Sequence, residues 1–472
     1  MTDPLHYQTI EQLAPLIETS SLSPTELCLH MLERIESLDP QLRAYATVMS
    51  DHALAQARVT EQELANGQYR GPLHGIPVAV KDLCDTAGVR TMGGCRVLAD
   101  RVPIADATVV SKLAAAGAVL LGKLNLTEGA MAGYNPEFQV PENPWKPGHW
   151  TGVSSSGSGS ATAAGLAFAT LGSDTGGSIR HPAAACGTVG LKPTWGRVSR
   201  HGVLDLAQSL DHVGPLTRSS HDAAVMLSAL AGPDPNDPTA LQVSPHYSSR
   251  TLGASGSKPL DGVRVGWDEV YASQDLASDL ASAVAAAVAV LEQLGATIVP
   301  VTVPARLREY MAAWPVICAS EAADAHRTTF PSRASEYGPW FAEWLRRGNA
   351  YTAADYAQAH HQRLACNGAF ARTMADVDLL ACPSSPRAAF PFPADVAYGP
   401  IPESRDPWDS RFTAPADYAG LPTLSVPCGL SPDELPLSLQ LVGHPLSEYF
   451  LTAIGTAFEQ ATTWNRLHPP QP

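Results

Sequence analysis

The stretch GVSSSGSGS, residues 152–160, holds five serines among nine residues, separated mostly by glycine. Taken alone, this composition is typical of a flexible linker between domains. A second stretch of small residues, GSDTGGSIRHP at 172–182, follows after one apolar segment. A linker should separate two self-sufficient patterns, but the same alternation of strands and helices is predicted on both sides. We therefore interpret both stretches as tight turns inside one domain.

The apolar pattern on either side predicts buried strands that alternate with helices. Strand 76–82, helix 107–117 and strand 118–123 form such a unit, which implies a right-handed crossover between parallel strands. Further strands are expected at 263–267, 297–303, 377–383, 422–427 and 435–443, and helices at 274–294 and 447–464. The expected fold class is α/β: a single large mixed, mainly parallel β-sheet covered by helices on both faces.

The chain is expected to form a single domain over 1–472. Its parts would be an N-terminal helical region at 1–65, a core carrying the chemistry at 66–230, a proline- and glycine-rich loop or insertion at 232–260, and a second part of the same sheet at 261–472.

Composition excludes several classes of function. The net charge is −15 with no basic stripe, so nucleic acid is not an expected partner. The eight cysteines are scattered without a C-x-x-C pair, which argues against a zinc ribbon or a disulfide framework. The N-terminus lacks the features of a signal peptide, and the most apolar helical stretch is too short to span a bilayer. We expect a soluble, cytoplasmic protein without a membrane partner.

Three features of the sequence can carry chemistry together. The run at 172–182 presents successive backbone N–H groups that suit an oxyanion, and Ser178 at its end could attack a carbonyl. Lys81 lies in the apolar run VAVKDL, where burial would lower its pKa from about 10.4 toward neutrality and make it a base. Two plainer interpretations stay open: the turns are structural, and Lys81 reaches water or pairs with Asp82.

Lys81, the serine-rich turn and DTGGSIRHP together resemble the amidase signature family, from Gly152 through Ala183 without a break. Five other segments also fit the family: GPLHGIPVAVKD, GKLNLTE, ACGTVGLKPTWGRVSRHGV, SLDHVGPLTRS and FTAPADYAGLPTLSVP. The two key serines of that family stand 24 positions apart, as Ser154 and Ser178 do here. The resemblance covers roughly residues 5 to 465 and implies the amidase signature fold.

The resemblance also implies a Ser–cis-Ser–Lys triad. Ser178 would be the nucleophile, Ser154 the bridge that relays the proton, and Lys81 the general base. The bond before the bridging serine is cis in the family, and Val153 stands where glycine is usual. The other implied site residues are the oxyanion-hole N–H groups of Thr175, Gly176, Gly177 and Ser178, substrate contacts at Met131 and Ser154, and supporting roles for Ser155, Asp174 and Arg180.

The function implied is hydrolysis of carbon–nitrogen amide bonds through an acyl-enzyme, with aryl esters or carbamates as further substrates. No metal or organic cofactor is needed, the partner is a small-molecule amide, and homodimers are common in the family. Two alternatives are the glutaminase (A) subunit of a tRNA-dependent amidotransferase and a non-catalytic binding protein on the same scaffold. The substrate pocket is expected from segments 310–347 and 398–411, whose aromatic residues are Trp314, Phe330, Trp340, Phe341, Trp344 and Trp408 among others.

Overall fold

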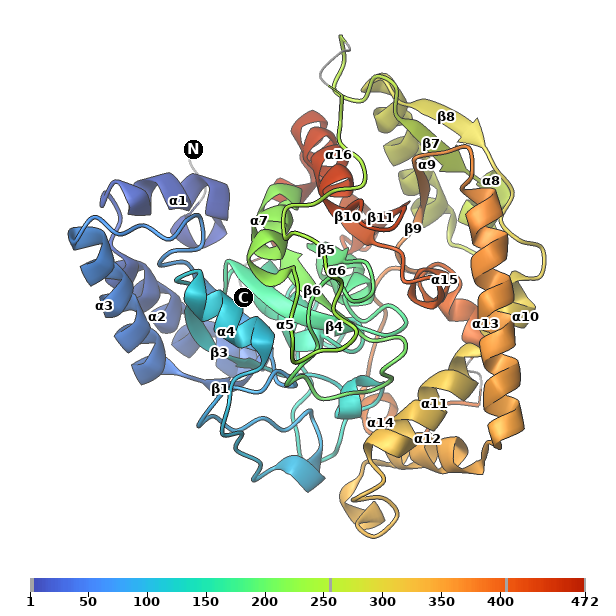
Figure 1. The fold of residues 1–472 in the computed structure, drawn as a ribbon, viewed down its shortest axis with the longest axis horizontal. Coiled ribbons are helices and arrows are strands. Elements are labelled where there is room, and N and C mark those ends of the chain that lie inside the picture. The colour runs from blue at the N-terminus through green and yellow to red at the C-terminus, as the bar shows by residue number, and fades with distance from the viewer. Residues whose placement is uncertain (1–3, 254–256, 404–405, 471–472) are drawn as a thin grey trace.

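The computed structural model describes residues 4–253, 257–403 and 406–470. Among these residues, eleven strands form one sheet in the order β1-β3-β2-β4-β6-β5-β10-β11-β9-β7-β8 (Figure 1). The strands are β1 Tyr45–Val48, β2 Pro77–Lys81, β3 Val119–Leu124, β4 Ala169–Asp174, β5 Val189–Lys192, β6 His212–Thr217, β7 Arg264–Trp267, β8 Thr297–Pro300, β9 Leu379–Pro383, β10 Thr423–Leu430 and β11 Pro436–Gly443.

Helices flank this sheet on both faces (Figure 1). The α-helices are α1 Ile10–Glu18, α2 Pro24–Leu42, α3 Ser50–Ala65, α4 Thr108–Ala115, α5 Ser156–Ala163, α6 Arg180–Cys186, α7 Ser220–Leu230, α8 Glu269–Ser273, α9 Ser278–Gln293, α10 Leu307–Met311, α11 Trp314–Ala325, α12 Pro339–Ala350, α13 Ala353–Thr373, α14 Ala394–Ala397, α15 Ala414–Tyr418 and α16 Glu448–Ala461. The short 3₁₀ helices are η1 Leu5–Tyr7, η2 Arg96–Leu98, η3 Glu128–Ala130, η4 Ala334–Glu336, η5 Pro407–Ser410 and η6 Trp464–Arg466.

The predicted mixed sheet is confirmed, but the expectation that it is mainly parallel is wrong. Among the described strands, β2–β3, β2–β4, β7–β8 and β7–β9 pair in parallel, and the other six pairs are antiparallel. The crossover from β2 through α4 to β3 is parallel, as predicted. In contrast, β6 enters between β4 and β5 and runs antiparallel to both. A helix between two strands in the sequence shows that the chain crosses over the sheet. It does not show that the two strands pair with each other.

The carboxyl ends of β2 and β4 place the candidate site near the middle of the sheet. These two strands are hydrogen-bonded neighbours, with Val80 opposite Leu171. β2 ends at Lys81, and β4 ends at Asp174, where the turn to α6 begins. Helices α11 to α13 lie at one side of the sheet (Figure 1) and bring the 314–347 segment toward this turn. The described part of 232–258 contains neither helix nor strand, in agreement with the predicted loop.

Candidate active site

Lys81 is fully buried at the end of β2 and is surrounded by hydroxyl groups. Its Nζ lies 2.6 Å from Ser154 Oγ, 2.9 Å from Ser155 Oγ and 2.9 Å from Ser173 Oγ. Asp82, the alternative partner, lies instead 3.3 Å from Lys123 Nζ. Both plainer interpretations of Lys81 are therefore wrong: it neither reaches water nor pairs with Asp82.

Burial lowers the pKa of Lys81 to about 7, although attraction from Cys84, Asp174 and Asp211 offsets part of this effect. A neutral amine has two N–H donors and one lone pair. Three hydroxyl neighbours can satisfy all three positions without a buried charge. The site can therefore hold Lys81 as a proton acceptor near neutral pH.

The serine-rich stretch forms a sharp turn that leads into α5. The Val153–Ser154 peptide bond is cis. Gly152 has φ of +80°, and a Cβ there would lie 2.4 Å from Pro182 Cα. A Cβ on Gly157 would lie 2.4 Å from the Ala44 carbonyl oxygen. Small residues occur here because α5 is buried along its whole length against neighbouring backbone, not because the segment is a linker.

The second turn, between β4 and α6, is organised by the carboxylate of Asp174. It accepts hydrogen bonds from Gly177 N at 2.6 Å and Ile179 N at 2.9 Å. The Gly177 N–H is thus already hydrogen-bonded inside the turn. Ser178 follows with 8% of its surface exposed, and its carbonyl accepts from Ser155 N at 3.3 Å.

Side chains from distant segments fix the peptide planes of this turn. Trp314 Nε1 donates to the Thr175 carbonyl at 3.0 Å, and Thr413 Oγ1 donates to the Gly176 carbonyl at 2.6 Å. Because a trans peptide points its N–H opposite to its carbonyl, each bond also sets the direction of the next N–H. The N–H groups of Thr175, Gly176 and Ser178 remain candidates for binding an oxyanion.

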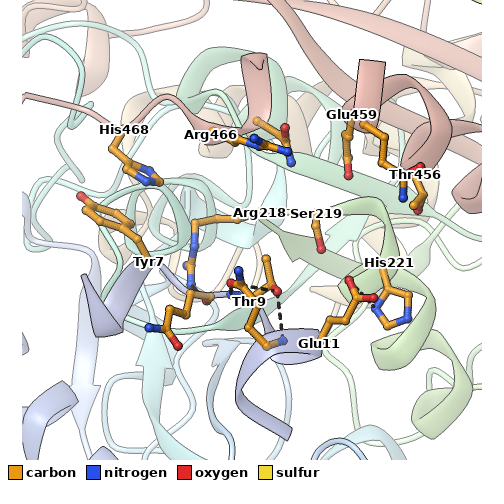
Figure 2. A pocket seen from close by; sticks show the side chains of 14 residues that line it. Tyr7, Thr9, Glu11, Arg218, Ser219, His221, Thr456, Glu459, Arg466 and His468 are labelled. Carbon is orange, nitrogen blue, oxygen red and sulfur yellow. Dashed lines mark hydrogen bonds and ion pairs between the residues drawn. The ribbon is translucent and has the colours of Figure 1, made fainter. Parts of the chain in front are cut away.

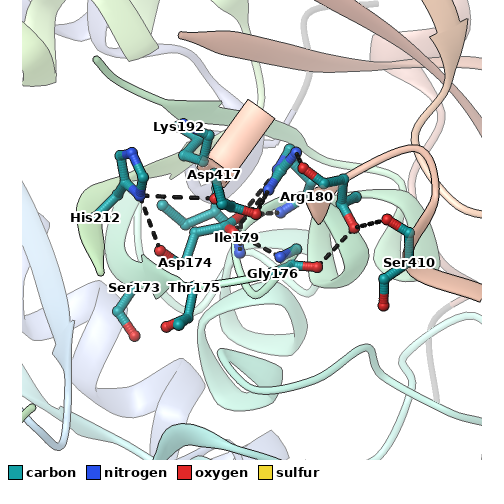
Figure 3. A network of polar contacts seen from close by, with 12 residues as sticks. Ser173, Asp174, Thr175, Gly176, Ile179, Arg180, Lys192, His212, Ser410 and Asp417 are labelled. Carbon is teal, nitrogen blue, oxygen red and sulfur yellow. Dashed lines mark hydrogen bonds and ion pairs between the residues drawn. The ribbon is translucent and has the colours of Figure 1, made fainter. Parts of the chain in front are cut away.

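Arg180 ties the turn to α15 through two buried carboxylates. Its guanidinium lies 2.8 Å from Asp174 and 2.7 Å from Asp417, and all three side chains are fully buried (Figure 3). Burial by itself raises the pKa of Asp174, but Arg180 outweighs it and holds this pKa well below its usual range. Burial raises the pKa of Asp417. These contacts connect the turn that follows β4 with α15.

A cavity of about 560 Å³ lies beside the two turns, with Val153 and His181 in its wall. Most of the wall is aromatic or aliphatic. The lining residues are Ala132, Gly133, Trp150, Val153, His181, Trp340, Ser385, Pro386, Arg387, Phe390, Phe392, Val396, Pro402, Asp406, Asp409 and Ser410. This cavity is the candidate substrate site.

Only some of the aromatic residues that the sequence predicts for the substrate pocket line this cavity. Trp340 lines the cavity, and Trp314 packs over Gly176 in the turn between β4 and α6. Phe330, Phe341 and Trp344 are buried in the core instead, and Trp408 packs on two arginine side chains.

Other parts of the wall carry no recognisable sequence signal. Met131 is buried, and its neighbours Ala132 and Gly133 form the wall rather than Met131 itself. Trp150 and Phe390 were missed because nothing in the sequence links their segments. Ser173 was missed as a Lys81 neighbour, although its place in β4 just before Asp174 is a signal that could have found it.

A second cavity, of about 550 Å³, lies where the two ends of the chain meet (Figure 2). Its wall combines the N-terminal segment, the start of α7 and the end of α16. The lining residues are Tyr7, Gln8, Thr9, Glu11, Gln12, Arg218, Ser219, His221, Thr456, Glu459, Gln460, Asn465, Arg466 and His468. Neither this wall nor that of the 560 Å³ cavity contains a residue of the predicted triad, but the 560 Å³ cavity includes Val153, which directly precedes Ser154, and His181, three residues after Ser178.

The family model described as Amidase matches residues 26–451. "Putative amidase AmiD" of Mycobacterium tuberculosis is 42% identical over 471 residues, which cover 98% of this chain and 95% of the relative. The (A) subunit of the glutamyl-tRNA(Gln) amidotransferase of Chloroflexus aurantiacus is 37% identical over 495 residues, with 98% and 99% covered.

Among solved structures, the native peptide amidase of Stenotrophomonas maltophilia has a TM-score of 0.83 at 30% identity, with 99% of both chains covered. The fold agrees with that of the amidase structures over nearly the whole chain. The chain belongs to the amidase family, and it is an enzyme that hydrolyses carbon–nitrogen bonds of amides. No helix among the described residues is long and apolar enough to cross a membrane.

Proposed function

We propose that the protein is a free-standing amide hydrolase in which Ser178, Ser154 and Lys81 act as a Ser–cis-Ser–Lys triad. The observation that carries this proposal is the buried Lys81 amine, which has three hydroxyl neighbours and no paired carboxylate. A buried lysine without a carboxylate partner is unfavourable for stability, so its presence calls for a chemical role.

The reaction would proceed in two halves. Ser178 Oγ attacks the amide carbonyl while its proton passes to Ser154 Oγ, and the Ser154 proton passes to Lys81 Nζ. Lys81 returns a proton through Ser154 to the leaving nitrogen, so that the carbon–nitrogen bond breaks and an acyl-enzyme remains. Water then attacks the acyl-enzyme by the same proton route and releases the acid. The N–H groups of Thr175, Gly176 and Ser178 would stabilise the negatively charged oxygen in both halves.

The wall of the 560 Å³ cavity supports an apolar acyl group. Trp150, Trp340, Phe390 and Phe392 together favour an aryl or a branched alkyl substituent. Aryl esters and carbamates present the same carbonyl to Ser178 and are included as secondary substrates.

The test is Ser178→Ala assayed on a panel of primary amides, anilides, esters and carbamates. We expect kcat/KM to fall by at least about 10³-fold, because removal of a nucleophile disables the whole triad. Ser248→Ala, at a partly exposed loop serine, is the matched control and should keep full activity. Mass spectrometry should also show a serine-directed phosphonate on Ser178. Turnover that survives in Ser178→Ala would contradict the mechanism.

The alternative is the glutaminase subunit of a tRNA-dependent amidotransferase, which is favoured by the 37% identity to such subunits over nearly the whole chain. The two functions predict different substrates for the isolated chain and a different dependence on partner subunits. A free-standing amidase should hydrolyse aryl amides without a partner. A glutaminase subunit should act on glutamine and respond to its partner subunits. The cluster of Lys81 with Ser154 argues against the third hypothesis, a non-catalytic binding protein.

A further inference from the structure

His181 stands in the first turn of α6, three residues after Ser178, and its side chain lines the candidate substrate cavity. The imidazole edge packs directly over Gly177: a Cβ built there would lie 2.5 Å from His181 Cε1. The ring of Trp150 lies beside it, with 5.8 Å between the centroids. His181 is thus the cavity residue that lies against the peptide preceding the candidate nucleophile.

The His181 ring also has unused hydrogen-bonding capacity. Its Nε2 is buried, and no described protein group is within hydrogen-bond distance of it. Burial and the nearby Arg180 charge lower the pKa of His181 to about 4, with a smaller opposing effect from Asp174. The imidazole is therefore neutral at pH 7 and offers one N–H donor and one acceptor nitrogen. A buried polar nitrogen without a partner costs free energy unless a bound molecule supplies one.

The charged groups of the same wall are already paired. Arg387 lies 2.8 Å from Asp409, and Asp406 lies 2.8 Å from Arg308. The remaining wall is mostly aromatic or aliphatic, with two serines, Ser385 and Ser410. A charged substituent would find no free counter-charge on this wall, whereas an uncharged polar group could bond to His181.

We propose that His181 selects substrates whose acyl part carries an uncharged hydrogen-bonding group, such as a hydroxyl on an aromatic ring. This inference rests on the proposed function, because the acyl group reaches the cavity only when Ser178 is the nucleophile. His181 acts here as a specificity-determining residue rather than as part of the proton relay.

The experiment compares primary carboxamides, from which only ammonia leaves, so that the aromatic ring belongs to the acyl group. Benzamide, the three hydroxybenzamides and a carboxybenzamide are assayed by ammonia release. We expect at least one hydroxybenzamide to exceed benzamide in kcat/KM by about tenfold, in line with one hydrogen bond to a buried group. The carboxybenzamide should be the poorest substrate.

Three variants separate the explanations. His181→Phe should reduce the hydroxybenzamide-to-benzamide ratio to within about twofold of one, because the ring is kept but the nitrogens are lost. His181→Gln, which can still donate and accept, should retain most of the ratio even if His181→Phe folds poorly. His361→Phe, at an exposed position of α13, is the matched control and should leave the ratio unchanged.

The outcomes distinguish this inference from the proposed function. If no hydroxybenzamide is preferred, or if His181→Phe keeps the preference while benzamide is still hydrolysed, the role of His181 is overturned and the amidase function stands. If the wild-type protein hydrolyses none of the amides and the phosphonate leaves Ser178 unlabelled, the proposed function itself fails.

Discussion

At the scale of single residues, Lys81 shows how surroundings decide what a side chain can do. Lys81 and Lys123 lie on neighbouring strands and are both fully buried, yet only Lys123 has a carboxylate, Asp82, close by. Because Asp82 pairs with Lys123, the hydrogen-bond partners of Lys81 are serine hydroxyl groups. Lys123 forms a buried ion pair with Asp82, while Lys81 can lose its proton near neutral pH.

This difference predicts the pH dependence of the enzyme. Burial lowers the pKa of Lys81 to about 7, and the base must be neutral to accept a proton. We therefore expect kcat/KM to rise with pH through about 7 and to level off above it. Lys81→Arg should be inactive at every pH because a guanidinium stays protonated. Steady-state rates from pH 5.5 to 9.5 measure both, and a flat wild-type profile would contradict the role of Lys81.

At the scale of elements, the turn from β4 to α6 depends on charges that come from another part of the chain. Asp174 holds Gly177 N and Ile179 N, Arg180 holds Asp174, and Asp417 of α15 binds the other side of Arg180. The turn that carries Ser178 is therefore held by a segment about 240 positions further along the chain.

Arg180→Met tests this network. It leaves two buried carboxylates without their shared cation, so we expect the free energy of unfolding to fall by about 3–5 kcal/mol. We also expect kcat to fall in whatever protein remains folded, because the turn loses its support. Urea unfolding and steady-state kinetics measure these effects. Arg306→Met, which removes an exposed ion pair with Glu309, should change neither, and equal effects in the two variants would refute the explanation.

At the scale of the whole molecule, the two ends of the chain are joined to the central sheet near one cavity (Figure 2). Arg218 is buried there and donates to the carbonyls of Gln8, Thr162 and Ala167. Tyr7 stacks on His468, with 3.7 Å between the ring centroids. Arg218 thus connects the N-terminal segment with the loop between α5 and β4.

Arg218→Met should loosen this connection while the catalytic cavity stays intact. Its loss leaves buried carbonyls unpaired, and we expect a stability decrease of about 2–4 kcal/mol. Hydrogen exchange should accelerate first in α1, with kcat unchanged below the unfolding range. Arg466→Met, at an exposed position of the same cavity, serves as the control. Uniform acceleration across the sheet would show that Arg218 has no special role at the N-terminus.

The sequence by itself determined the α/β class, most strands and helices, and the candidate triad. Short apolar runs are local signals that can be read directly from the sequence. The candidate triad came from the resemblance to the amidase signature family, in which the two serines stand 24 positions apart, as Ser154 and Ser178 do. The cis bond before Ser154, implied by the family resemblance, is present in the structure.

Only the tertiary structure decided the direction of the strand pairs, the residues that line the cavity, and the hydrogen bond from the Gly177 N–H to Asp174. The insertion of β6 between β4 and β5 leaves no local trace, because pairing joins residues about 40 positions apart. The cavity wall gathers Trp150, Trp340 and Phe390 from three distant segments. These features arise from contacts between residues far apart in the chain, and such contacts are settled by packing rather than by local pattern.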